Sequence, residues 1–380
     1  MKIVIVIPHL TSIGGAARYA WEFSEYLSSQ GDDVIIVSLY TDRQLYRSNS
    51  RMRIIDLTNK KDLTQSIKFW WNLKKISKSL HNLINQEKPD IVFFNHYPCT
   101  MWVEKYDDIP TICYPQDINL LYTDTYINNL PAKIQIPWRI IRLFIRIYDK
   151  RKWKFFDEII CHSNFTAKNV RKFYNVNPKV MLLGTDIKKF CPKNIPKSNC
   201  ILTLGDTKIR RADLLLKAAA ILSTKRKDFK IWIVGSKGKL DSDLKNLTKK
   251  FNLEEQVEFF GKVSDEELVE LYSQALVVTH LVKEAPFGLI VTESMSCGTP
   301  VIAWKPGGPE EIIVHDETGF LIEENDEKNL IRYIEKFLDS PNLSNDMGLN
   351  ARNRSTKFFN LLNHHKQMRD HLQYWINKKS

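Results

Sequence analysis

The stretch EAPFGLIVTESMSCGTPVIAWKPGGPEE, from Glu284 to Glu311, decides how the rest of this chain is interpreted. It holds two carboxylates, Glu284 and Glu293, on either side of a glycine turn at 287–289, and it ends in a Gly-Gly-Pro loop. The turn should start a short helix that carries Glu293. Carboxylates accept hydrogen bonds from hydroxyls, and backbone N–H groups at a helix start hold anions. The stretch therefore predicts a pocket for a ligand with both hydroxyls and phosphates, such as a sugar nucleotide.

Outward from this stretch, short apolar runs alternate with amphipathic helical segments. The expected strands cover 3–8, 34–39, 91–95, 111–114, 158–163 and 180–183, and then 201–205, 230–235, 257–260, 275–279, 300–304 and 319–322. Expected helices include 16–30, 212–222, 241–251 and 265–274. This alternation is typical of parallel sheets covered by helices on both faces, and two such sheets are more economical than one. The sequence predicts an α/β protein with two Rossmann-like domains.

The break between the two domains is expected at 190–199, which contains two prolines and precedes a new apolar strand. We expect an N-terminal domain at 1–190, a C-terminal domain at 191–355, and a last segment at 356–380. Ligands of such sheets bind beyond the carboxyl ends of the strands. The predicted site is therefore the cleft between the two domains.

Composition limits the class of protein. The 380 residues are 43% hydrophobic and 26% charged, as in a soluble globular protein. The sequence contains no run of 18 apolar residues, so no membrane-spanning helix is expected. The apolar N-terminus is better explained as a first strand than as a signal peptide. The six cysteines form no Cys-x-x-Cys pair, which favours free thiols in a reducing cytosol over disulfides or zinc. The net charge of +12 favours an anionic partner: phospholipid, pyrophosphate or nucleic acid.

A glycine turn after the first strand is the first candidate for ligand contact. Gly14 and Gly15 open the first expected helix, where free N–H groups and the helix dipole favour phosphate or sugar. The spacing is not Gly-x-Gly-x-x-Gly, and no acidic residue ends the second strand, which argues against NAD or FAD. The alternative is a plain strand-to-helix turn.

A basic turn follows the first strand of the second sheet. After Gly205, the cations Lys208, Arg210 and Arg211 fall within four residues. Arginine neutralises a diphosphate through paired hydrogen bonds and lysine does so as a point charge. The alternative is a solvated basic loop.

Residues 286–303, PFGLIVTESMSCGTPVIA, resemble the family-four glycosyltransferases of the GT-B fold, which carry a context like E-x-F-G-L-x-x-x-E-A-M-A-C-G-T-P-V-I-A. The similarity extends over nearly the whole chain. Further matching positions are Val234-Gly235, Phe260-Gly261, the segment 315–321, Gly14-Gly15 and Ser163-Asn164-Phe165-Thr166. The resemblance implies two Rossmann-like domains facing across a cleft, with the C-terminal helix packed back on the N-terminal domain.

The resemblance also implies an activity: retaining transfer of a hexose from a nucleotide-sugar to an acceptor hydroxyl, with the leaving phosphate taking the acceptor proton and no metal ion. Glu293 would bind the ribose, Glu284 the sugar hydroxyls, and Arg210, Lys208 and Arg211 the diphosphate. The expected backbone contacts to the donor lie in one segment: Phe287, Gly288, Leu289 and Ile290. Gly205 and the amides of Gly14 and Gly15 complete the donor site.

Two departures from the family pattern concern the same site. Eight residues, rather than seven, separate Glu284 from Glu293. Asp206 stands where the family has arginine, so Lys208 is expected to compensate and Arg210 or Arg211 to replace the family lysine.

On the acceptor side, many relatives have a histidine that the strand end at 112–117 lacks here. His9 and His96, each after another strand, are the alternatives, although a lone histidine is as often structural. Tyr114 and Asp117 are further candidates for this side.

A basic and aromatic segment at 133–156 has eight Lys or Arg and one Asp, with Arg139, Arg142 and Arg146 at helical spacing. A second such segment is 68–78. Basic faces beside Trp and Leu suit an interfacial membrane helix, whereas a core helix with a solvated basic side is the alternative. We expect a peripheral protein on the cytoplasmic membrane face and a lipid-linked or other glycan acceptor. Similarity to mannosyltransferases of lipid-linked oligosaccharide assembly makes GDP-mannose the first donor and UDP-sugars the competitor.

Other classes fit less well. A sugar-nucleotide epimerase or a phosphorylase does not explain 287–303, and no pyridoxal-binding lysine can be placed. A nucleic-acid-binding protein would need aromatic side chains on exposed strands, and Trp70 and Trp71 fall in a helical pattern. A catalytically inactive relative that only binds sugar is left open by the altered Glu spacing.

Overall fold

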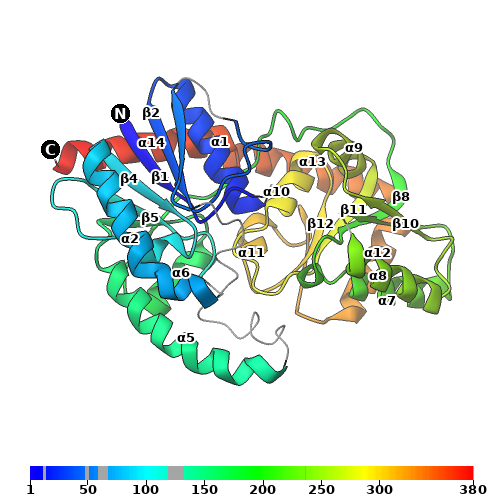
Figure 1. Ribbon diagram of the computed structural model, residues 1–380. Coiled ribbons are helices and arrows are strands. Elements are labelled where there is room, and N and C mark those ends of the chain that lie inside the picture. Colours follow the sequence, from blue (N-terminus) through cyan, green and yellow to red (C-terminus); the bar gives the residue numbers. More distant parts are fainter. Residues whose placement is uncertain (12–13, 48–50, 59–66, 119–131, 236, 380) are drawn as a thin grey trace. The chain divides into compact units, whose positions relative to one another are not determined.

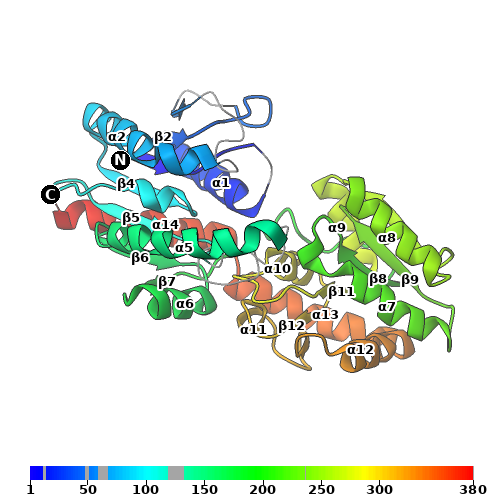
Figure 2. The same cartoon turned by 60° about the horizontal axis from the view of Figure 1, so that its bottom comes forward.

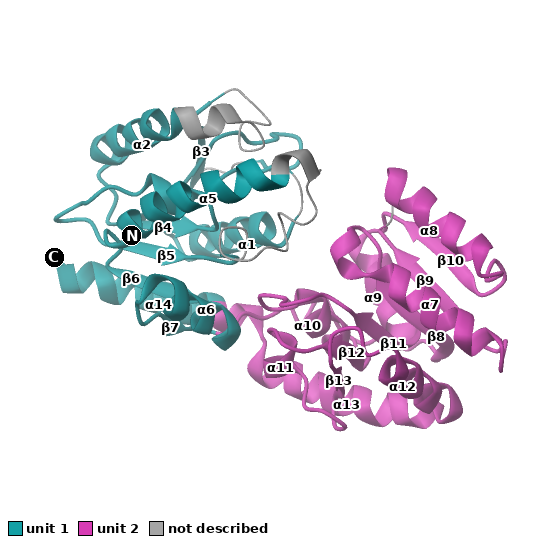
Figure 3. Cartoon of the chain, turned by 90° about the horizontal axis from the view of Figure 1, so that it is seen from below, with its two compact units in different colours: residues 1–181, 365–380 teal, residues 182–364 magenta. Residues whose placement is uncertain are grey.

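The computed structural model describes residues 1–380 apart from 12–13, 48–50, 59–66, 119–131, 236 and 380 (Figure 1). The chain divides into two compact units (Figure 3): unit 1 comprises 1–181 and 365–380, and unit 2 comprises 182–364. The expected boundaries at 190 and 355 differ from these divisions, because residues 182–190 and 356–364 belong to unit 2. Each unit is a parallel sheet covered by helices, which confirms the predicted α/β class with two Rossmann-like domains.

Unit 1 is built on a parallel sheet with the strand order β3-β2-β1-β4-β5-β6-β7. Its strands are β1 (Lys2–Val6), β2 (Asp33–Ser38), β3 (Met52–Asp56), β4 (Ile91–Asn95), β5 (Thr111–Tyr114), β6 (Glu158–Cys161) and β7 (Lys179–Val180). Its helices are α1 (Gly15–Ser29), α2 (Ile67–Glu87), η2 (Cys99–Trp102), α5 (Ala132–Trp153), α6 (Asn164–Tyr174) and most of α14 (Leu361–Lys379).

Helices cover both faces of this sheet. On one face α2, η2 and α5 pack on apolar strand residues such as Val4 and Val92. The course of α2 and α5 can be followed in Figure 2. On the other face α1 and α14 meet, because Phe23 contacts both Phe93 and His365. Strand residues point alternately to the two faces, so strands buried on both sides have apolar side chains at nearly every position.

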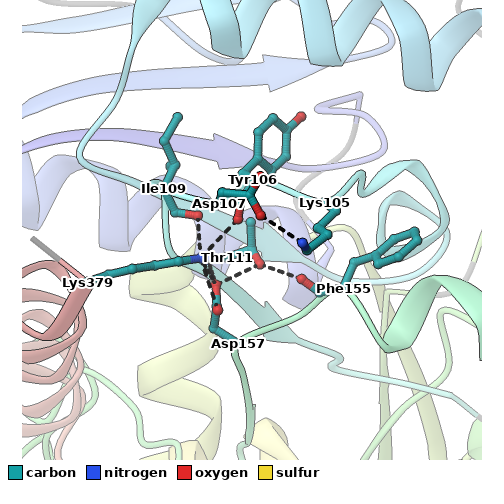
Figure 4. A network of polar contacts seen from close by, with 8 residues as sticks. All are labelled: Lys105, Tyr106, Asp107, Ile109, Thr111, Phe155, Asp157 and Lys379. Carbon is teal, nitrogen blue, oxygen red and sulfur yellow. Dashed lines mark hydrogen bonds and ion pairs between the residues drawn. The ribbon is translucent and has the colours of Figure 1, made fainter.

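The C-terminal helix α14 belongs to unit 1 from His365 onward, so it returns to the N-terminal domain as predicted. The Arg369 guanidinium donates to both carboxylate oxygens of Asp32, at 2.7 and 3.1 Å. At the far end of the helix, Lys379 Nζ donates to the carbonyls of Tyr106 and Ile109 and to the carboxylate of Asp157 (Figure 4). Asp157 also accepts from the Thr111 amide at 2.7 Å. The last residues of the chain are thus tied to the start of β5.

Unit 2 has a parallel sheet with the order β10-β9-β8-β11-β12-β13. Its strands are β8 (Ser198–Leu204), β9 (Lys230–Val234), β10 (Val257–Gly261), β11 (Ala275–His280), β12 (Val301–Trp304) and β13 (Gly319–Ile322). Its helices are η3 (Lys208–Arg210), α7 (Ala212–Ser223), α8 (Gly238–Lys250), α9 (Asp265–Gln274), α10 (Leu289–Ser296), α11 (Pro309–Ile312), α12 (Glu327–Asp339) and α13 (Pro341–Phe358).

The strand order of unit 2 determines where its candidate residues meet. β11 pairs with β8 on one side and with β12 on the other. Because these strands are parallel, the segments 205–211, 281–288 and 305–308 leave the sheet at the same edge. The basic turn, the glycine turn and the Gly-Gly-Pro loop are therefore neighbours, although up to a hundred residues separate them in the sequence.

Candidate donor site

The glycine turn before α10 has the backbone needed to bind an anion. Gly288 precedes the helix with φ +111°, a conformation that side chains rarely adopt, and α10 begins at Leu289. The side chains of Phe287 and Ile290 are buried, so only their backbone groups can serve a ligand. The backbone contacts to the donor that the sequence predicts for 287–290 stay a prediction.

The Gly-Gly-Pro loop packs directly against this turn. The Gly308 amide donates to the Ala285 carbonyl at 2.7 Å. A Cβ at Gly308 would lie 2.2 Å from the Phe287 carbonyl oxygen, and a Cβ at Gly307 would lie 3.0 Å from that of Ala285. The two glycines are therefore needed for close packing of one backbone on another, and the loop supports the turn.

Glu293, one turn into α10, is buried, with 6% of its surface exposed. The Tyr272 hydroxyl of α9 donates to Glu293 Oε2 at 3.4 Å, and Tyr272 is fully buried. Burial and the nearby Glu293 carboxylate together raise the pKa of Tyr272 well above its usual value. Tyr272 thus stays a neutral donor that orients the carboxylate.

Glu284 lies in the irregular segment between β11 and the glycine turn. Its side chain is half-buried and its backbone is left-handed, with φ +50°. A residue other than glycine in this region is uncommon and marks a constrained turn. The extra residue between Glu284 and Glu293 falls in this turn rather than in α10.

The basic turn after β8 carries its own counter-charges. Arg210 forms an ion pair with Asp206, and the Arg211 guanidinium binds both oxygens of Asp213, at 3.0 and 3.1 Å. Arg211 also lies over the ring of Trp304, 5.9 Å from its centroid. Lys208 is exposed in η3. Asp206, which stands where the family pattern has arginine, is thus the counter-ion of Arg210.

At the carboxyl edge of the unit 1 sheet, polar side chains link the ends of β4 and β5 to α1. Gln116 Nε2 donates to Asn95 Oδ1 at 2.8 Å, and Asn95 Nδ2 donates to the Ala16 carbonyl at 3.2 Å. Next to Asn95, His96 is left-handed with φ +75°, and its amide donates to the Tyr114 carbonyl. Burial, and secondly the charge of His9, hold the pKa of His96 at about 4.

The other unit 1 candidates differ in exposure. Tyr114 is fully buried and stacks on Tyr19 with the ring centroids 4.8 Å apart, so its side chain is part of the core. Asp117 is half-buried just beyond β5. Gly14 caps α1 and Gly15 is its first residue, as the sequence predicts. The donor roles proposed for both glycines thus concern unit 1, whereas the other donor candidates are in unit 2.

Two residues near the candidate donor site are not predicted from the sequence. Tyr272, the partner of Glu293, lies in an ordinary helical pattern that gives no signal. His280 ends β11 next to the glycine turn, and its place at a strand end was the only available sign. Among the described residues, no group of three or more His, Cys, Asp or Glu could hold a metal ion.

Two protein-family models match consecutive parts of the chain. Residues 13–188 match "Glycosyltransferase Family 4", and residues 187–354 match "Glycosyl transferases group 1". The chain belongs to the family-four glycosyltransferases. The two matches meet close to the boundary between the units, so each unit of the glycosyltransferase corresponds to one family domain.

Relatives of the glycosyltransferase act on different sugars. The N-acetyl-alpha-D-glucosaminyl L-malate synthase of Bacillus anthracis is 24% identical over 93% of this chain and 92% of its own length. The alpha-1,3/1,6-mannosyltransferase ALG2 of Mus musculus is 29% identical over 53% of this chain and 55% of its own.

Solved structures share the fold of the glycosyltransferase. Sucrose-phosphate synthase of Thermosynechococcus elongatus superposes with a TM-score of 0.81, at 19% identity and 99% coverage of both chains. HepE of Anabaena, solved with UDP-glucose, superposes with a TM-score of 0.75 at 17% identity. The superposition covers 98% of this chain and 100% of the HepE chain. The predicted GT-B fold is confirmed.

Proposed function

We propose that this glycosyltransferase moves a hexose, with retention, from a nucleotide-sugar to a glycan acceptor carried at a membrane. The observation that carries the proposal is the meeting of three loops at one sheet edge of unit 2: the basic turn, the glycine turn and the Gly-Gly-Pro loop. Together they offer backbone N–H groups, arginines and a buried carboxylate, which are the groups that a sugar nucleotide needs.

In the proposed reaction, the bond between the sugar C1 and the diphosphate oxygen breaks while the acceptor oxygen bonds to C1. The acceptor proton passes to the departing diphosphate, whose growing negative charge has to be stabilised. The amides around Gly288, with Arg210, Arg211 and Lys208, supply that stabilisation. Glu293 binds the ribose and Glu284 the sugar hydroxyls, and no metal ion takes part.

The donor base and sugar are proposed from relatives. Similarity to ALG2, a mannosyltransferase, favours GDP-mannose, whereas the neighbour solved with UDP-glucose keeps UDP-sugars as the second candidate. The purified chain should be incubated with radiolabelled GDP-mannose, UDP-glucose and UDP-N-acetylglucosamine. Even slow hydrolysis of one donor separates an enzyme from an inactive sugar-binding relative. The activity proposal fails if no donor is turned over with a crude lipid-linked acceptor fraction present.

Helix α5 supports the membrane part of the proposal. Its inner face packs into the core of unit 1 through Trp138, Ile145 and Tyr148. The opposite face exposes an apolar stripe: Ile136, Ile140, Leu143, Phe144 and Ile147, which are between 53% and 72% exposed. The spacing of these five residues places them along one side of the helix.

Basic side chains adjoin this stripe. Lys150, Arg151 and Lys154 are exposed at its C-terminal end. An apolar face beside cations suits the surface of an anionic bilayer, in which the stripe would lie parallel to the membrane. Within the described residues, no helix is long and apolar enough to cross a bilayer. In the second basic segment, 68–78, the side chains of residues 68–71 are not among those that the structure describes.

We expect the double variant Leu143→Gln/Phe144→Gln to bind vesicles of anionic phospholipid about tenfold more weakly than the unmodified protein, because two large apolar side chains no longer enter the interface. Co-flotation at low salt measures the partition. Leu349→Gln, which changes a 64% exposed leucine on α13 of unit 2, is the matched control and should change nothing. Failure of the unmodified protein to float with anionic vesicles at low salt would remove the membrane from the proposal.

A further inference from the structure

His280 is a buried polar residue to which the proposed mechanism assigns no role. It is the last residue of β11, and only 5% of its surface is exposed. Its Nε2 atom is enclosed, with no hydrogen-bond partner among the described residues. A buried nitrogen without a partner costs about 1–3 kcal/mol, so such atoms are rare in native proteins and call for an explanation.

The nitrogen faces the glycine turn. A Cβ at Gly288 would lie 3.6 Å from His280 Nε2, 3.2 Å from Val291 Cγ2 and 3.6 Å from Pro309 Cγ. The space that this glycine leaves without a side chain is therefore bounded by the imidazole, the first turn of α10 and the Gly-Gly-Pro loop. His280 Nε2 thus lies beside Gly288, directly before the first residue of α10.

The same imidazole lies close to the basic turn. Burial, and secondly the charge of Arg210, lower the pKa of His280 to about 3. The ring is therefore neutral at physiological pH and has one N–H to donate. Such a ring neither adds a charge nor delivers a proton.

We propose that His280 donates a hydrogen bond from Nε2 to a diphosphate oxygen of the nucleotide-sugar seated at the start of α10. This inference rests on the proposed function, because it deepens the same site. It explains the unpartnered nitrogen as one whose partner is the ligand. The bond strengthens as charge grows on the departing diphosphate, so His280 contributes to transition-state stabilisation without proton transfer.

The test compares His280→Leu with His280→Gln. A hydrogen bond to a charged group is worth enough to make GDP or UDP bind about 10- to 100-fold more weakly to the leucine variant, and kcat/KM for the donor should fall by a similar factor. The glutamine variant, which keeps an N–H donor, should recover most of both losses. Because the ring stays neutral, the pH profile of kcat/KM between pH 6 and 8 should have the same shape in the glutamine variant as in the unmodified protein.

Stability separates a binding role from a structural one. His280→Leu should unfold no earlier than the unmodified protein without nucleotide, since it removes an unpartnered buried nitrogen. His364 of unit 2 is the matched control: it is also buried, but its Nδ1 is paired with the Leu182 carbonyl. His364→Leu should lower the Tm and leave nucleotide affinity unchanged.

The outcomes distinguish this inference from the function on which it rests. If the protein turns over a donor and His280→Leu matches it in nucleotide affinity and kcat/KM, the role of His280 is refuted while the function stands. If GDP or UDP binds but no sugar is transferred, the activity fails, and the affinity of the leucine variant still decides the role of His280. If neither nucleotide binds, both are overturned.

Discussion

Replacing Glu293 by glutamine is expected to lower kcat/KM for the nucleotide-sugar by about 100-fold with little change in stability. A carboxylate can accept hydrogen bonds from both hydroxyls of a ribose, whereas the amide keeps one acceptor and turns a donor toward the second hydroxyl. Each hydrogen bond to a charged group contributes about 1.5–3 kcal/mol, so the loss of one accounts for this factor. The fold should tolerate the change, because the amide has the shape of the carboxylate and can still accept from the Tyr272 hydroxyl.

Steady-state kinetics and calorimetry with the nucleoside diphosphate measure the effect of Glu293→Gln. Glu266→Gln is the control, because Glu266 is an exposed glutamate in the first turn of α9, in the same unit. Full transferase activity and unchanged nucleotide affinity in Glu293→Gln would remove the central assignment of the donor site. If Glu266→Gln lost as much kcat/KM and nucleotide affinity as Glu293→Gln, the cause would be the change in net charge rather than a contact to the ribose.

The alternation of strands and helices was readable from the sequence, because strands buried on both faces form continuous apolar runs. Every expected strand has a counterpart in the structure. The strand that was missed, Met52–Asp56, lies at the edge of its sheet. Four of its five residues are at least partly exposed, so it lacks the apolar run that identified the others.

Side-chain pairing was much less predictable. Lys208, Arg210 and Arg211 were correctly placed on a turn after the first strand of unit 2. The two arginines form ion pairs with Asp206 and Asp213, and Arg211 has a left-handed backbone with φ +54°. No sequence pattern indicates these features. Glu284 is a similar case, since the extra residue in its segment was visible but the conformation that accommodates it was not.

Burial also separated residues that the sequence treated alike. Tyr114 and Asp117 are both candidates at the end of β5, yet Tyr114 is enclosed between α1 and the sheet, whereas Asp117 is half-buried. His280 is the opposite case: the sequence gives no reason to choose it, because a lone histidine at the end of an apolar strand is usually structural. Its significance depends on the unpartnered nitrogen and on the distance to Gly288, which require coordinates.

The second large effect is expected from Gly308→Ala. Gly308 has an ordinary backbone, with φ −54°, so alanine meets no conformational strain there. Its Cβ, however, would lie 2.2 Å from the carbonyl oxygen of Phe287 and 2.3 Å from its Cα. Both are backbone atoms of the glycine turn, which cannot give way as a flexible side chain could. We expect a loss on the order of 3 kcal/mol in the free energy of unfolding, or a displaced turn.

A displaced turn would also abolish nucleotide binding, because the Gly308 amide donates to the Ala285 carbonyl and α10 starts four residues after Ala285. Gly238→Ala provides the opposite case: its φ of +58° makes alanine strained, but nothing lies within 4 Å of the new Cβ. That variant should lose about 1–2 kcal/mol and keep its nucleotide affinity. Chemical denaturation and calorimetry separate the two effects. If Gly308→Ala binds GDP or UDP as tightly as the unmodified protein does, the Gly-Gly-Pro loop does not position the turn, and its glycines need another explanation.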